Sequence, residues 1–147
     1  MPENTHFKNL EAMYYAAPIN DFYKPAMTVT KGQAEITISL SNKLHHAAGA
    51  VHGSVYFKML DDAAFFAANS LETDVFVLTT SFTTYLTRPV SCGKMHAIGR
   101  VVHQNKSQFI AEAIVYNDDR NEIARGNGIF VRSKIALNST KGYSATP

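Results

Sequence analysis

Apolar residues in the first 41 positions of the chain follow two different periods. Residues 7–16 place apolar side chains at helical spacing, and Pro18 ends the run. Residues 26–41 instead alternate between apolar and polar positions, as a half-buried strand does. The sequence therefore predicts a short amphipathic helix at about 6–17, followed by one long strand.

The middle of the chain predicts a buried helix. A turn-rich segment at 41–53 leads into residues 54–70, which are apolar on nearly every face of a helix. After it come four strand-like runs, the last three joined by short turns, at 75–87, 94–104, 107–117 and 122–133. This order predicts an α+β fold, in which a meander of four strands and the earlier strand wrap one central helix.

The chain is expected to form a single domain over residues 1–147. Its length is the usual size of one globular domain, and 46% apolar residues can build a substantial core. We expect that core to run from about residue 26 to residue 134. The tail from about 136 to 147 is small and polar, so it is expected to fray.

Charge and cysteine content narrow the range of partners. The net charge of +2 is too small for a nucleic-acid or polybasic membrane surface, so the expected partner is a small molecule. Cys92 is the only cysteine, which leaves no intrachain disulfide and favours a cytoplasmic location. No stretch approaches the roughly 20 apolar residues of a membrane span. We expect neither a metal nor a cofactor.

Two adjacent carboxylates, Asp61 and Asp62, lie on the predicted buried helix. An ionised carboxylate in apolar surroundings costs several kcal/mol unless it is paired. Lys58 precedes Asp62 by four residues, and we interpret these two as a structural pair. Asp61 lies roughly 100° further round the helix. It is the candidate for chemistry, an interpretation that the preceding motif strengthens.

The segment from His46 to Ser54 (HAAGAVHGS) leads into the buried helix. Gly49 and Gly53 allow close backbone approach, and free amides at a helix start favour developing negative charge. The segment therefore has the features of an oxyanion hole. Taken alone, these residues fit equally well a flexible helix start capped by Ser54. The association with Asp61 favours the oxyanion hole.

The run from His46 to Asp61 resembles the signature of phenylacetate-degradation-type hotdog thioesterases. That signature is an Asn followed by Gly, then His-Gly-Gly, then an acidic residue on the central helix. Gly49, His52, Gly53 and Asp61 fall at the family's spacing, and residues 79–89 resemble its next strand, which ends in Arg-Pro. The resemblance covers roughly residues 30–133.

The resemblance implies a hotdog fold and hydrolysis of an acyl-CoA substrate. By it, Gly53 donates its amide to the thioester oxygen, His52 shapes the loop, and Asp61 acts as nucleophile or as base toward water. Two positions depart from the family's pattern, since His46 stands where many relatives carry Asn, and Ser54 replaces the second Gly of His-Gly-Gly. A histidine can still donate a hydrogen bond to a carbonyl oxygen, so we retain His46 as an auxiliary donor. The alternative, a loop histidine that faces solvent, is favoured for the neighbouring His45.

Relatives of this type often carry a hydroxyl residue on the strand after the helix, where it hydrogen-bonds the carboxylate or the water. Counting back from Pro89 favours Thr79 for this role, with Thr80 as the next choice. Three further hydroxyl residues follow on the same strand, and exposed threonines are ordinary in strands. One sequence does not fix the register among them.

Basic residues at the strand ends are candidates for contacts with the phosphates of CoA. Among them we retain Arg88 and Lys106, with a solvated surface charge as the alternative for each. Cys92 follows a Pro-Val-Ser turn with no evident base beside it, so a catalytic thiol is not expected there.

Two other functions occur among proteins of this fold. Hydratase and dehydratase relatives carry Gly-His-Phe-Pro, or Asp followed by Asn-Pro and His, and neither string occurs here. A non-catalytic acyl-CoA sensor would lack the helix carboxylate or carry a DNA-binding extension. Asp61 is present, and the 25 residues before the first predicted strand leave no helix-turn-helix. We therefore favour a thioesterase, with an acyl-CoA-binding protein as the first alternative and a hydratase or dehydratase as the second.

The spacing of Gly53 and Asp61 predicts an oligomer. The two residues are eight positions apart, which is about 12 Å along a helix axis. A reacting carbonyl must lie within about 3 Å of both its oxyanion donor and its attacking group. Two helices packed antiparallel across a two-fold axis would bring Gly53 of one chain to Asp61 of the other. We predict at least a homodimer, with a dimer of dimers as the alternative.

Overall fold

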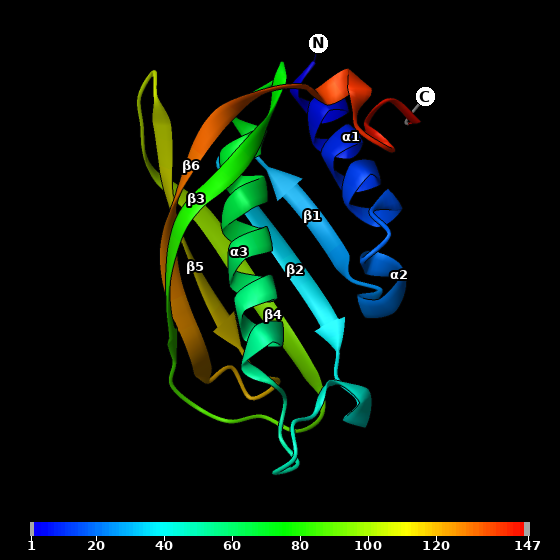
Figure 1. Cartoon of the computed structure of the whole chain (residues 1–147), viewed down its shortest axis with the longest axis vertical. Coiled ribbons are helices and arrows are strands. Elements are labelled where there is room, and N and C mark those ends of the chain that lie inside the picture. Colours follow the sequence, from blue (N-terminus) through cyan, green and yellow to red (C-terminus); the bar gives the residue numbers. More distant parts are fainter. Residues whose placement is uncertain (1, 146–147) are drawn as a thin grey trace.

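The computed structural model of the chain describes residues 2–145, in which one antiparallel sheet curves around a long helix (Figure 1). Its helices and strands are α1 (Glu3–Ala16), α2 (Asn20–Tyr23), β1 (Ala26–Thr30), β2 (Gln33–Ser39), α3 (Gly53–Ser70), β3 (Val75–Leu86), β4 (Lys94–Gln104), β5 (Gln108–Tyr116) and β6 (Glu122–Ala136). Short 3-10 turns lie at Asn42–Leu44, Leu137–Ser139 and Tyr143–Ala145. The α+β class predicted from the sequence is confirmed.

The sheet has the strand order β1-β2-β4-β5-β6-β3, with every neighbouring pair antiparallel. The prediction of one strand over 26–41 is wrong, because the chain turns at Lys31 and Gly32. Gly32 has a φ of +73°, which favours glycine, and β1 and β2 pair on either side of it. The meander of four strands is also wrong: β3 pairs with β6, and only β4, β5 and β6 follow one another. The connection over residues 87–93 runs past the end of the sheet and leaves β3 at its edge (Figure 1).

Helix α3 packs its buried face against the sheet. A Cβ atom at Gly99 on β4 would lie 2.2 Å from the carbonyl of Ala63, so the approach of helix to strand requires glycine at this position. A stripe along α3 is only partly covered, and it consists of Ser54, Phe57, Lys58, Asp61, Asp62 and Phe65. Although α3 has 18 residues, no helix between residues 2 and 145 has the length and apolarity that a membrane span requires.

The chain after Ile135 is packed rather than frayed, as far as the structure describes it. Leu137 and Tyr143 are each only 1% exposed. The ring of His6 on α1 joins the two ends of the chain: its Nε2 donates to the carbonyl of Asn69 at 2.8 Å, so its Nδ1 accepts from the hydroxyl of Tyr143 at 2.7 Å. The predicted flexible tail is therefore wrong up to Ser144, and its last two residues lie outside the described range.

The His6 contacts predict a specific pH dependence of stability. Burial holds the pKa of His6 below its ordinary value of 6.5, although the hydrogen bond to Asn69 and the charge of Glu72 act in the opposite direction. The unfolded chain therefore binds a proton at a pH where the folded chain does not. This contribution to stability is complete above pH 6.5 and is lost as the pH falls from 6.5 towards the folded pKa.

We expect His6→Gln to cost more unfolding free energy at pH 7.5 than at pH 5.5, as measured by urea denaturation. Asp61 also titrates in this range, with a folded pKa of about 6 and the opposite sign. For this reason wild type and variant are compared at each pH, so that the Asp61 contribution cancels. An equal cost at both pH values would show that His6 is not held neutral by the fold.

Candidate active site

Asp61 lies on the partly covered stripe of α3, beside β3. Its Oδ1 accepts a hydrogen bond from the hydroxyl of Thr79 at 2.9 Å. Burial raises the pKa of Asp61 to about 6; the Thr79 hydrogen bond and Lys58 act against this rise, and Asp62 adds to it. A carboxylate with a pKa near neutral is suited to accept a proton from water at physiological pH. Asp61 can therefore act as a base or as a nucleophile.

A bulge in β3 distinguishes Thr79 from Thr80. The register between β3 and β6 shifts between Thr79 and Ser81, so Thr80 is the extra residue of the bulge. The hydroxyl of Thr80 donates to the carbonyl of Ile129 at 3.1 Å. Of the two threonines favoured from the sequence, only Thr79 contacts the carboxylate.

Asp62 is held in a structural cluster. Its Oδ2 accepts from Nζ of Lys58 at 2.5 Å and from the hydroxyl of Tyr14 at 2.7 Å. The Lys58 ammonium also lies 5.2 Å and 4.9 Å from the ring centroids of Tyr14 and Tyr23. The predicted pairing of Lys58 with Asp62 is confirmed. The contact with Tyr14, from α1, was not predicted.

An apolar cavity of about 300 Å³ opens beside Asp61 and Thr79. Three parts of the fold line it: the corner between α1 and α2, the partly covered stripe of α3, and the first half of β3. The corner contributes Met13, Tyr14, Ala17, Ile19 and Asn20, and the other two parts contribute Lys58, Asp62, Phe65, Phe66, Phe76 and Leu78 beside the two site residues. The carboxylate therefore faces a space suited to an apolar group.

The start of α3 borders a second cavity, of about 400 Å³, which His46, Gly53 and Arg88 help to line. His52 caps this helix, since its Nδ1 accepts from the amide of Ser54 at 3.0 Å. The alternative of Ser54 as the cap is therefore wrong. The amide of Gly53 begins the helix, and between residues 2 and 145 it finds no acceptor. It remains available, at the positive end of the helix dipole, for a carbonyl oxygen.

The two neighbouring histidines of the loop have different surroundings. His46 is exposed, and its Nδ1 accepts from the amide of Ala48 at 3.1 Å, which leaves Nε2 as the protonated nitrogen. Among residues 2–145 this Nε2–H has no acceptor, so it can donate to a substrate oxygen. His45 is half-buried, and its Nε2 donates to the carbonyl of Ser91 at 2.8 Å. His45 therefore fixes the loop to the connection after β3, whereas we expected it to face solvent.

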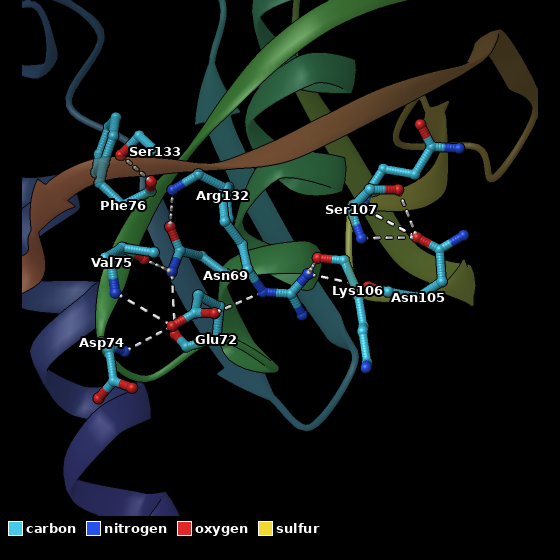
Figure 2. Close-up of polar contacts among 12 residues, drawn as sticks. Asn69, Glu72, Asp74, Val75, Phe76, Asn105, Lys106, Ser107, Arg132 and Ser133 are labelled. Atoms are coloured by element: carbon cyan, nitrogen blue, oxygen red, sulfur yellow. Dashed lines mark hydrogen bonds and ion pairs between the residues drawn. The ribbon is translucent and has the colours of Figure 1, made fainter.

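Arg88 and Lys106 lie at opposite ends of the molecule. Arg88 lines the cavity at the start of α3, whereas Lys106 occupies the turn between β4 and β5 at the far end of the sheet (Figure 1). The carbonyl of Lys106 accepts from Arg132 at 3.0 Å, and Arg132 also donates to Glu72 at 2.8 Å (Figure 2). One chain therefore does not bring Arg88 and Lys106 to a common phosphate.

Comparison with known proteins identifies the family. The family model of the thioesterase superfamily matches residues 48–124, which is more than half of the chain. The chain belongs to the thioesterase superfamily. A search of curated proteins finds no significant match.

Solved structures share the fold of this superfamily member. The PaaI protein of the Escherichia coli phenylacetic acid degradation operon is 20% identical, with a TM-score of 0.83 over 91% of this chain and 97% of that one. A thioesterase family protein from Silicibacter pomeroyi is 21% identical, with a TM-score of 0.79 over 88% and 97%. A variant of a thioesterase enzyme from Staphylococcus aureus is 17% identical, with a TM-score of 0.71 over 77% and 96%. The predicted hotdog fold is confirmed.

The superfamily match and the site overlap in part. The matched residues include Gly53, Asp61 and Thr79, but neither His46 nor the corner between α1 and α2. No three His, Cys, Asp or Glu side chains within residues 2–145 gather in a way that could hold a metal ion. The candidate site thus consists of a carboxylate, a hydroxyl, a helix-start amide and a histidine.

Proposed function

We propose that this thioesterase superfamily member hydrolyses an acyl-CoA thioester to a free acid and CoA. The observation that carries the proposal is the Asp61–Thr79 hydrogen bond, which holds a carboxylate of raised pKa at the side of an apolar cavity. We further place the protein in the cytoplasm, where CoA esters are present and its thiol stays reduced.

In the proposed reaction, Asp61 takes a proton from water as the water oxygen bonds to the thioester carbon. The carbonyl electrons move onto oxygen, where the Gly53 amide and Nε2–H of His46 stabilise the negative charge. Reformation of the carbonyl then breaks the carbon–sulfur bond, and the CoA thiolate takes up the proton. If Asp61 instead attacks the carbon directly, the carbon–sulfur bond breaks, the CoA thiolate leaves and an acyl-aspartyl anhydride forms. Water then cleaves the anhydride to the free acid and a protonated Asp61, which gives its proton to the thiolate; both routes use the same groups.

We propose that two chains share each site. Within one chain, Asp61 and Gly53 line different cavities. Strand β3 lies at the edge of the sheet, has 12 residues and carries exposed apolar side chains, with Leu78 42% and Tyr85 56% exposed. A long apolar edge strand is a template for pairing with another chain. Pairing of two β3 strands across a two-fold axis would set the α3 helices antiparallel, so that Gly53 approaches Asp61 of the second copy.

The CoA moiety would lie near Gly53 in this arrangement. Arg88 borders the same cavity, so we propose that it contacts a phosphate. Lys106 is at the other end of its own chain, so it would reach that CoA only from the second copy. A dimer of dimers is compatible with the same pairing.

A thiol-release assay over a panel of acyl-CoAs tests the proposal. We expect turnover with apolar acyl groups, measured as the reaction of free CoA with a thiol reagent. Acyl-CoA binding by calorimetry without thiol release would favour a non-catalytic binding protein. Absence of both turnover and binding would refute the assignment of an acyl-CoA substrate.

Thr79→Val is expected to shift the pH dependence of hydrolysis. The Thr79 hydroxyl lowers the pKa of Asp61, so its removal should raise that pKa above about 6. Because the ionised carboxylate is the active form in both routes, kcat/KM should rise with pH and level off above the pKa. The midpoint of this profile should therefore move to higher pH in Thr79→Val. Thr80→Val is the matched control, since Thr80 bonds Ile129 instead; a shift in the control alone would contradict the assignment.

A further inference from the structure

We propose that the corner between α1 and α2 determines which acyl groups the protein accepts. In this inference, which rests on the proposed function, the acyl chain lies in the cavity beside Asp61 and ends against Ala17 and Ile19. The substrate class is then a CoA ester of an apolar acyl group larger than acetyl, with an upper limit set by this corner.

The position of the cavity supports this assignment. Helix α3 lies between β3 on one side and α1 on the other (Figure 1). The cavity spans this face of α3, so that Thr79 on β3 and Ala17 after α1 line the same space. The reacting carbonyl must lie within about 3 Å of Asp61. In the proposed dimer, the CoA portion extends from there towards the start of α3 in the second copy. The acyl chain is then left to extend towards the corner.

The chemistry of the walls selects an apolar group. Phe65, Phe76 and Leu78 line the cavity, and Ile19 adds an apolar side chain that is 57% exposed and outside the core. The charges of Lys58 and Asp62 at the wall are paired with each other. Apart from Asp61, the wall residues within the described range thus offer no unpaired charge, and an ionised acyl group would lose its hydration there without compensation. A volume of about 300 Å³ is at the lower limit of small-molecule sites, which suits an acyl group but not a whole CoA ester.

The corner is a fixed wall rather than a free end. Asn20 is 4% exposed, and its side-chain amide donates to the carbonyl of Tyr14 at 2.8 Å. Its backbone amide donates to the carbonyl of Ala17 at 2.9 Å. These two bonds, together with the fixed φ of Pro18, hold the segment between α1 and α2 in one conformation. A wall of this kind sets a definite limit on the length of the acyl group.

Ala17 is the position at which a substitution should change the maximum length of the accepted acyl group. It is the smallest residue of the cavity wall, and its backbone (φ −64°, ψ 127°) is extended, a conformation that every L-residue before proline can adopt. A larger side chain is therefore compatible with the backbone and would occupy the cavity. Ala17→Trp should shorten the accepted acyl chain.

The test measures kcat/KM for saturated acyl-CoAs from two to twelve carbons. In the wild type, each methylene buried in the cavity should raise kcat/KM by about 4-fold until the chain reaches the corner. In Ala17→Trp the rise should stop at a shorter chain, so that the ratio of octanoyl-CoA to butanoyl-CoA falls at least about 10-fold. Phe22→Trp is the control, because Phe22 is 57% exposed and does not line the cavity; its ratio should equal that of wild type.

An unchanged ratio in a folded Ala17→Trp protein would overturn the inference. If that variant fails to fold, Ala17→Leu should show a smaller shift in the same direction, and an unchanged ratio there would overturn it equally. Calorimetric binding of acyl-CoA thioethers, which cannot be hydrolysed, gives the same comparison without turnover. A chain-length limit in binding that Ala17 controls, in a protein that releases no thiol, would refute the proposed hydrolysis but not the role of the corner.

Discussion

Replacing Asp61 with Asn is expected to lower kcat for thioester hydrolysis by about 10²- to 10⁴-fold. Asparagine keeps the volume of aspartate and can still accept the hydrogen bond from Thr79, but it can neither take a proton from water nor attack a carbonyl. Because burial raises the pKa of Asp61 to about 6, the folded protein must hold an ionised carboxylate in unfavourable surroundings at any pH above 6, and this lowers its free energy of unfolding. The variant should therefore be at least as stable as wild type at pH 7.5 in a urea titration.

Asp62→Asn is the matched control, since it changes the adjacent carboxylate in the same way. That substitution removes the charge paired with Lys58, which is only 12% exposed, and weakens the bond to Tyr14. We expect a loss of stability and a much smaller loss of kcat. Normal hydrolysis by folded Asp61→Asn would contradict the assignment, and so would a larger loss of kcat in Asp62→Asn.

The central helix and the two carboxylates on it could be predicted because the pattern that indicates them lies within one short stretch of the sequence. The apolar run of 54–70 differs from the observed α3 by one residue at its start. The pairing of Lys58 with Asp62 follows from a spacing of four residues on a helix. The choice of Thr79 required a count along one strand, and the bulge after Thr79 is what separates it from Thr80.

Contacts between distant segments could not be predicted in the same way. The pairing of β3 with β6 depends on a connection that passes the end of the sheet, and strand periodicity carries no information on which strands are neighbours. The turn within 26–41 did leave a signal, because Gly32 interrupts the alternating run. Tyr143 was a further signal, an aromatic residue in an otherwise polar tail, but its partner His6 is 137 positions away.

The part of the candidate site that sequence reasoning missed comes from α1. The pattern of residues 7–16 identified an amphipathic helix, and it did not indicate that Tyr14 would bond Asp62 or that Ala17 would line the cavity of Asp61. Both contacts join residues more than 40 positions apart in the sequence, and their formation depends on where the whole sheet places α1. Only the structure reveals them.

The shared site can be tested with mixed dimers of two inactive variants. One variant, His46→Ala with Gly53→Val, removes the histidine donor and adds a branched side chain that should block the approach of a carbonyl oxygen to the amide of residue 53. The other, Asp61→Ala, lacks the carboxylate. A Cβ at position 53 would lie 3.0 Å from Cδ1 of Leu86, which is 50% exposed and can move, so the first variant should fold. Each variant alone should lose about 10²-fold or more of its activity.

Co-expression of the two variants with different tags yields mixed dimers that can be purified through both tags. If Gly53 of one chain acts with Asp61 of the other, one of the two sites in each mixed dimer receives all its wild-type groups, and purified mixed dimers should show about half of the wild-type thiol release. Verified mixed dimers that remain as inactive as either parent would show that the groups act within one chain.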